Sequence, residues 1–245
     1  RGHAIASVID EHIALNHAPR VFACPVDLPL MPYRGMLRQA EHVERCILDW
    51  ADTRRGHPRP DDLLSIVVNA RDERGRPVDR KTLAGHVLTL FAASYETCQS
   101  VLTWTLFLLA QHPRVAGILL DELRSSHVDI SPSGRQVERL PYLDAVIRES
   151  MRILPPVPFQ VRVAMGPTTL GGVDVPRGTR VILSALVTNR RAETYRDPDH
   201  FVPERWASID PSPFEYLSFS AGPRMCPGMR FGLAVVKVAV AAITM

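Results

Sequence analysis

The sequence contains little of what marks several classes of protein. It has 245 residues but only four cysteines, none of them in a CxxC pair or in a spacing typical of a zinc site or a secreted disulfide framework. No signal-peptide pattern opens the chain, and its most apolar region, residues 83–110, is interrupted by the polar run SYETCQS. These absences argue against a secreted disulfide-rich domain and against a transmembrane segment, and they favour a reducing compartment.

The chain is also poor in lysine and in net charge. Only two of its 29 basic residues are lysine, Lys81 and Lys237, and the net charge at pH 7 is +3. No run of basic residues is interleaved with aromatic residues, so a nucleic-acid partner is not expected. The bias toward arginine is typical of a GC-rich bacterial genome, and with the cysteines it predicts a cytoplasmic, bacterial protein. Because 46% of the residues are hydrophobic and no repeat is present, we expect a globular core.

What the sequence does contain is a series of helical patterns. Apolar residues recur at helical spacing over about 33–52, 61–70, 79–112, 113–124 and 141–154. Asp79 is placed to cap the longest helix, which would be roughly 50 Å long and, being apolar on nearly every face, buried. A β-rich segment follows at about 159–186, with turns at Gly171-Gly172 and Pro176–Gly178. The expected fold class is mainly α with a small β-hairpin region.

The stretch FSAGPRMCPG, residues 219–228, places one cysteine among residues that can stabilise a thiolate. If a helix begins at Pro227, Cys226 is its N-cap and faces the positive end of the helix dipole. Gly222 permits a tight turn, and Gly228 lets a flat ligand approach the backbone. Taken alone, a single cysteine in an apolar neighbourhood is more often a small buried residue. An iron-binding thiolate is the alternative that the surrounding loop favours.

Five residues at fixed offsets make this loop a specific signature. It resembles FxxGxRxCxG, the haem-binding motif of the cytochrome P450 family of haem-thiolate monooxygenases, through Phe219, Gly222, Arg224, Cys226 and Gly228. The resemblance implies that haem b, iron protoporphyrin IX, binds here with the Cys226 thiolate as its axial ligand. Arg224 would then hold a haem propionate, and Phe219 would shield the sulfur from water.

The resemblance extends over most of the chain. It runs from about Tyr33 to the end and implies a cytochrome P450-like fold that is truncated at the N-terminus and within the last helix. Residues 1–245 would form one partial domain, little more than the C-terminal half of a family member. We therefore expect that the chain cannot fold stably and turn over alone, because much apolar surface would stay unburied.

Three charged residues resemble a structural cluster of the same family. Glu149 and Arg152 form a Glu-x-x-Arg pair in the helix over 141–154, where side chains at i and i+3 share one face. Such a pair alone is weak evidence, since similar pairs occur on many exposed helices. Arg205, in FVPERW, resembles the arginine of the family's PERF element. The resemblance implies a buried, mutually satisfied cluster that pins the segment before the cysteine.

The long helix carries a candidate proton relay. Residues 93–97, ASYET, resemble the family's Ala/Gly-Gly-x-Asp/Glu-Thr motif, with Ser94 in place of glycine. The resemblance implies that Glu96 and Thr97 are catalytic and deliver protons to bound dioxygen through a water held in a helix distortion. The alternative is that Thr97 hydrogen-bonds its own helix and that Glu96 reaches a surface groove.

Further assignments follow from the resemblance alone. Arg162 matches an arginine that reaches a haem propionate, although an arginine in a short strand is more often on the surface. Ser220 and Val235 depart from a common glycine and a common glutamate of the family. Four residues would border the substrate pocket: Ala93, Val157, Pro158 and Phe159.

Together these features predict a monooxygenase that inserts one oxygen atom from O2 into an apolar small molecule, by hydroxylation or epoxidation. Electrons would come from a partner such as a ferredoxin with its reductase, since no flavin or iron–sulfur segment is present. Two alternatives stay open. One is a peroxide-using haem-thiolate enzyme or a hydroperoxide lyase or isomerase, and the other is a non-catalytic gene remnant or helical binding module. The sequence does not identify the substrate.

Overall fold

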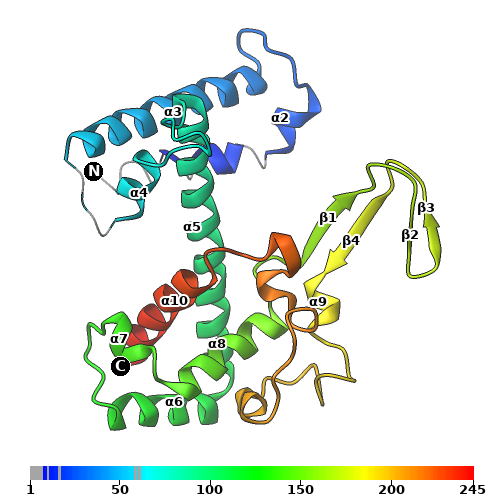
Figure 1. Cartoon of the computed structure of the whole chain (residues 1–245). Helices are drawn as coiled ribbons and strands as arrows, with labels where there is room; N and C mark the ends of the chain where they lie inside the picture. Colours follow the sequence, from blue (N-terminus) through cyan, green and yellow to red (C-terminus); the bar gives the residue numbers. More distant parts are fainter. Residues whose placement is uncertain (1–7, 10, 16–17, 58, 60–61) are drawn as a thin grey trace. The chain divides into compact units, whose positions relative to one another are not determined.

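The computed structural model describes residues 8–9, 11–15, 18–57, 59 and 62–245 (Figure 1). The chain forms two compact units, Arg1–Ala93 and Ser94–Met245. The division falls within helix α5, Arg80–Gln111. It falls there because this one helix supplies side chains to two separate apolar cores.

The first unit is helical in its described residues. It contains α2 (Pro19–Ala23), α3 (Pro32–Gly56), α4 (Leu63–Val68) and the beginning of α5. α3 extends beyond the predicted 33–52, and α4 is shorter than the predicted 61–70 because Asp62 is its N-cap, accepting the Ser65 N–H at 2.7 Å. α3, α4 and α5 meet in an apolar core made by Val43, Ile47, Ala51, Val68, Leu83 and Val87.

Helix α5 begins where the sequence indicates. The Asp79 carboxylate accepts the Thr82 N–H at 3.1 Å, as an N-cap does, and the helix ends before Pro113. The expectation that it is buried on nearly every face is wrong. Trp104 is 40% exposed and Phe107 50% exposed, because the cores of this chain cover only part of the helix surface.

In the second unit the C-terminal part of α5 packs around the larger core with α6 (Pro113–Ser125), α7 (Gly134–Val137), α8 (Pro141–Ile153) and α10 (Met229–Thr244). Proline occupies the first position of α6 and α8, where its fixed φ suits the helix and its missing N–H costs nothing. The carboxylate of Glu122, on α6, accepts the N–H groups of Tyr142 and Leu143 at 2.8 Å each, and so caps α8 from outside.

The strands form two small antiparallel sheets in this unit. β1 (Phe159–Val163) pairs with β4 (Arg180–Ser184). The chain between these two strands forms a hairpin, in which β2 (Thr168–Leu170) pairs with β3 (Val173–Val175) (Figure 1). The predicted turn at Gly171-Gly172 is present, with φ of +56° and +80°. The β-rich segment ends slightly earlier than the predicted residue 186, because the Ser184 side chain accepts the Val187 N–H and starts α9 (Ala185–Thr188).

Between α9 and α10 the backbone is mostly irregular, as expected. Three 3-10 turns interrupt it: η1 (Pro203–Ala207), η2 (Leu217–Phe219) and η3 (Gly222–Arg224). Side chains from α8 satisfy many of its backbone groups, so this segment is fixed by tertiary hydrogen bonds rather than by regular secondary structure.

Candidate functional site

The cysteine loop (residues 219–228) closes through its own backbone. The Cys226 N–H donates to the Phe219 carbonyl at 2.9 Å. Gly222 has a φ of +65°, a conformation that glycine adopts without steric cost. Phe219 packs against the larger core, whereas Cys226 is a free, exposed thiol. The loop therefore exposes the Cys226 sulfur, while packing of Phe219 against the core anchors the loop backbone.

The helix after the cysteine starts later than expected. α10 begins at Met229 with Gly228 as its N-cap, so the prediction that Cys226 caps a helix starting at Pro227 is wrong. Pro227 and Gly228 form a turn instead. A Cβ placed on Gly228 would lie 3.8 Å from the Cys226 sulfur, an ordinary van der Waals distance. Glycine here leaves the space beside the sulfur open.

The predicted relay residues lie on α5 close to where this helix meets α10. Glu96 is exposed, and Thr97 is half-buried. Burial raises the pKa of the neighbouring Cys98 thiol, which also hydrogen-bonds the Thr97 hydroxyl and lies within electrostatic range of Cys226. A Cβ on Gly232 would lie 3.7 Å from the Cys98 sulfur, so the two helices pack closely at this point. Glu96 and Thr97 both lie within the continuous helix α5.

The structure brings together the three residues of the predicted charge cluster. Glu149 and Arg152 are both fully buried, and two parallel hydrogen bonds of 2.9 Å join them. The Nε of Arg205 donates to the same carboxylate at 2.9 Å. The Arg152 guanidinium also lies 5.2 Å from the ring centroid of Tyr195. The buried negative charge is thus matched by two guanidinium groups.

The two arginines use their remaining donors on the irregular segment. Arg152 donates to the carbonyls of Asn189, Pro198 and His200, and Arg205 donates to the carbonyls of Arg196, Asp197 and His200. Carbonyl groups of a coil segment buried without such donors would cost about 1–3 kcal/mol each. The cluster therefore holds the backbone that leads toward the cysteine loop.

Trp206 is a further member of the cluster that sequence reasoning did not identify. Its indole Nε1 donates to Glu149 Oε2 at 3.0 Å, while the Val202 N–H donates to Oε1 at 3.0 Å. Its ring contacts Tyr216 at a centroid distance of 5.1 Å. The available signal was the last letter of FVPERW, since tryptophan carries a donor that the phenylalanine of a PERF element lacks.

Lys237 is a second residue that the sequence reasoning passed over. Although it lies in an apolar stretch of α10, it is buried, and its Nζ lies 2.6 Å from Asp144 Oδ1 on α8. Arg148 pairs with the other oxygen of Asp144 at 2.6 Å. A lysine among apolar neighbours predicts a buried partner, because an unpaired buried charge is costly. The pair joins the helix after the cysteine to the helix that carries Glu149.

The remaining predicted residues are more dispersed. The Arg162 guanidinium folds back onto its own strand, donating to the Val161 carbonyl at 3.0 Å and to Gln160 Oε1 at 2.9 Å. Arg224 is exposed, like Cys226. Val157, Pro158 and Phe159 are exposed at the start of β1, and Ala93 is exposed at the end of the first unit.

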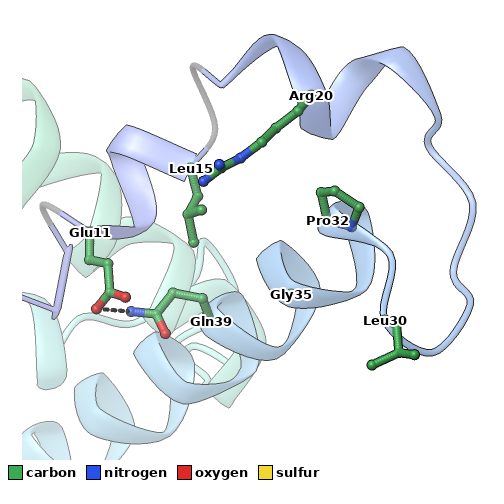
Figure 2. A pocket seen from close by; sticks show the side chains of 7 residues that line it. All are labelled: Glu11, Leu15, Arg20, Leu30, Pro32, Gly35 and Gln39. Atoms are coloured by element: carbon green, nitrogen blue, oxygen red, sulfur yellow. Dashed lines mark hydrogen bonds between the residues drawn. The ribbon is translucent and has the colours of Figure 1, made fainter.

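A shallow pocket lies elsewhere, in the first unit (Figure 2). Gln39 Nε2 donates to Glu11 Oε2 at 3.1 Å along one side of it. Its other lining residues are Leu15, Arg20, Leu30, Pro32 and Gly35, none of them a predicted site residue. Its lining is mixed in character, and every predicted site residue except Ala93 belongs to the second unit.

Comparison with known proteins decides the family. A model of the cytochrome P450 family matches residues 32–244. The chain belongs to the cytochrome P450 family. A cytochrome P450 of Mycobacterium tuberculosis is 30% identical over 228 residues, which cover 92% of this chain and 44% of that protein. The amorpha-4,11-diene 12-monooxygenase of Artemisia annua is 31% identical over 187 residues, 74% of this chain and 38% of that protein.

A solved P450 structure shows the same fold. The cytochrome P450DA heme domain superposes with a TM-score of 0.82 at 25% identity, over 99% of this chain and 53% of that chain. The predicted fold class, mainly α with small β-hairpins in a P450 arrangement, is confirmed. The chain spans less than half the length of the two P450 relatives described above.

The residues of the P450 cysteine loop fit the haem that the family implies. A single thiolate can bind iron only when the other ligands come with the metal, as in a porphyrin. Cys226 offers one exposed thiol on an anchored loop, and Arg224 offers an exposed cation two residues away.

None of the helices in the described ranges is both long and apolar enough to cross a bilayer.

Proposed function

We propose that this P450 chain carries the thiolate-ligand part of a haem-thiolate monooxygenase that acts on an apolar small molecule. The observation that carries the proposal is the cysteine loop, in which the Cys226 thiol is exposed and the Cys226 backbone N–H donates to the Phe219 carbonyl. The match over residues 32–244 and relatives named as monooxygenases support the reaction class.

Bound haem b would supply the activation of O2 and the transfer of one oxygen atom to the substrate. Cys226 would bind the iron through its sulfur, and the anchored backbone would hold that sulfur in place. Arg224 would pair with a propionate, since its guanidinium is exposed beside the loop. Arg162 is a weaker candidate for this role because its donors already serve Val161 and Gln160.

Glu96 and Thr97 would hold and move protons. Glu96, exposed, can take a proton from solvent, and the half-buried Thr97 hydroxyl can pass it on, because a hydroxyl both accepts and donates. Cys98 is the immediate neighbour of the Thr97 hydroxyl in this relay.

We further propose that electrons come from a separate donor such as a ferredoxin with its reductase, and that the enzyme works in a bacterial cytoplasm. Val157, Pro158 and Phe159 would contribute to an apolar substrate surface. Phe159 is 58% exposed in this chain and is therefore available to such a ligand.

The first test is a spectrum of the reduced, haem-loaded protein under carbon monoxide. We expect the strongly red-shifted band of thiolate ligation, and we expect the Cys226→Ala variant to lose it. An imidazole-type spectrum, or equal haem retention by Cys226→Ala, would refute the proposal.

The second test addresses the relay. Thr97→Ala should divert electrons from product to hydrogen peroxide, whereas the matched change Thr103→Ala, at an exposed position of the same helix, should not. The assay is the amount of product formed per electron consumed. An unchanged yield in Thr97→Ala would favour a peroxide-using enzyme over an O2-using one.

A further inference from the structure

Asn189 is a fully buried polar residue at the end of α9. Both the oxygen and the nitrogen of its side-chain amide form hydrogen bonds. Oδ1 accepts the Leu217 N–H at 2.9 Å, and Nδ2 donates to Ser218 Oγ at 3.0 Å. The Ser218 hydroxyl in turn donates to the Met151 carbonyl at 3.1 Å. The Asn189 side chain thus links the end of α9 to η2, the turn that leads into the cysteine loop.

The backbone of Asn189 is fixed from the other side. Its carbonyl accepts Arg152 Nη1 at 3.0 Å, and its N–H donates to the Ala185 carbonyl at 2.9 Å. Arg152 is the fully buried arginine of the charge cluster. Asn189 therefore connects the charge cluster on α8 with η2, because its carbonyl binds Arg152 and its side chain binds Leu217 and Ser218.

The connection continues to the cysteine through the backbone. The Ser220 N–H donates to the Leu217 carbonyl at 2.9 Å, and the Cys226 N–H donates to the Phe219 carbonyl at 2.9 Å. Leu217, held by Asn189, and Phe219, which holds Cys226, are the two ends of η2. Because hydrogen bonds are directional whereas apolar packing is not, these bonds fix the rotation and register of η2.

We propose that Asn189 is a positioning residue for the thiolate ligand, which sets η2 so that the Phe219 carbonyl holds Cys226 in the geometry that iron binding requires. The proposal rests on the haem-thiolate function proposed above. Asn189 does not touch the loop's sulfur, and its effect passes through Leu217 and Ser218.

Substitution of Asn189 by leucine keeps a similar volume and removes both side-chain hydrogen bonds. The Leu217 N–H is then left without its acceptor in a partly buried position. Asn69→Leu is a matched control, because Asn69 is exposed at the end of α4. Ser218→Ala is a milder variant, which keeps the bond from the Leu217 N–H to Asn189 and removes the acceptor of Nδ2 together with the hydroxyl that donates to the Met151 carbonyl. It covers the case in which Asn189→Leu does not fold.

The first measurement is hydrogen exchange of the protein, read by mass spectrometry on a peptide that covers residues 220–228. In Asn189→Leu we expect this peptide to exchange about tenfold faster, which corresponds to about 1.4 kcal/mol. Ser218→Ala should act in the same direction with a smaller factor, and Asn69→Leu should have no effect. If the peptide over residues 220–228 exchanges no faster in Asn189→Leu than in wild type, or if Ser218→Ala leaves it unchanged, the positioning role is overturned.

The second measurement is the rate at which the reduced carbon monoxide complex loses its red-shifted thiolate band. We expect this loss to be about tenfold faster in Asn189→Leu than in wild type or in Asn69→Leu. A wild-type protein without the band would refute the haem-thiolate function itself. A wild-type protein with the band, and an Asn189→Leu variant that loses it no faster than Asn69→Leu, would refute only the role of Asn189.

Discussion

The backbone at Ser220 provides a quantitative test of strain in the cysteine loop. Ser220 has a φ of +59° and a ψ of −175°, a region that residues other than glycine rarely occupy. Its Oγ donates to Gln160 Oε1 at 3.4 Å, which is long for a hydrogen bond between side-chain oxygens. Glycine is common at this position of the family. We therefore compare two variants, Ser220→Gly and Ser220→Ala.

The expected energies follow from the geometry. A residue held in this region costs about 1–3 kcal/mol, which glycine does not pay. Glycine loses about 0.5–1 kcal/mol through its greater freedom in the unfolded chain. Both variants lose the same weak hydrogen bond to Gln160, so it cancels between them. Ser220→Gly should therefore be more stable than Ser220→Ala by about 1 kcal/mol, the reverse of the usual order of alanine and glycine.

Gly117 supplies the control with the usual order. It is exposed in α6, and a Cβ placed on it meets no atom within 4 Å. Gly117→Ala should raise the free energy of unfolding by about 0.5–1 kcal/mol. The assay is thermal unfolding of the haem-loaded protein, where 1 kcal/mol corresponds to about 2–4 °C in Tm. If Ser220→Ala unfolds at the same temperature as Ser220→Gly or above it, the loop does not store the strain that we assign to it.

Three further predictions concern the surroundings of the loop. Trp206→Phe should lower the free energy of unfolding by about 1–3 kcal/mol because Glu149 loses a buried donor, whereas Trp104→Phe, at a 40% exposed position, should change it by less than about 0.5 kcal/mol. Glu122→Gln should cost about 1 kcal/mol through the weakened cap of α8, as measured by the same unfolding experiment. Burial raises the pKa of Tyr195 from 10.0 to about 12, so its contribution to stability is complete below pH 10.0 and is lost as the pH rises to about 12. Denaturant unfolding between these pH values should show a shallower decline in Tyr195→Phe, and an equal decline would contradict the assignment.

The sequence predicted best those features that depend on local signals. The Asp79 cap, the proline at the start of α8 and the Gly171-Gly172 turn each have a cause within a few residues, and each is present. The start of α10 was predicted at the wrong residue for a related reason. Pro227 is an acceptable first helical residue, but the Cys226 N–H is taken by a carbonyl seven positions earlier, and this bond holds the loop away from the helix.

What the sequence could not reveal is which partners a buried polar side chain chooses. Glu149 and Arg152 were recognisable as a pair because one helix turn joins them, whereas Trp206 and Asn189 reach the cluster from segments whose backbone is irregular and has no period to extrapolate. Their donors and acceptors are fixed only when the whole segment is in place. A sequence motif therefore identifies the thiolate ligand and the charged residues. The residues that orient them can be identified only from the hydrogen bonds of the folded chain. The comparison of Asn189→Leu with Asn69→Leu therefore tests a role of the whole irregular segment. It decides whether this segment sets the geometry of the Cys226 thiolate or merely surrounds it.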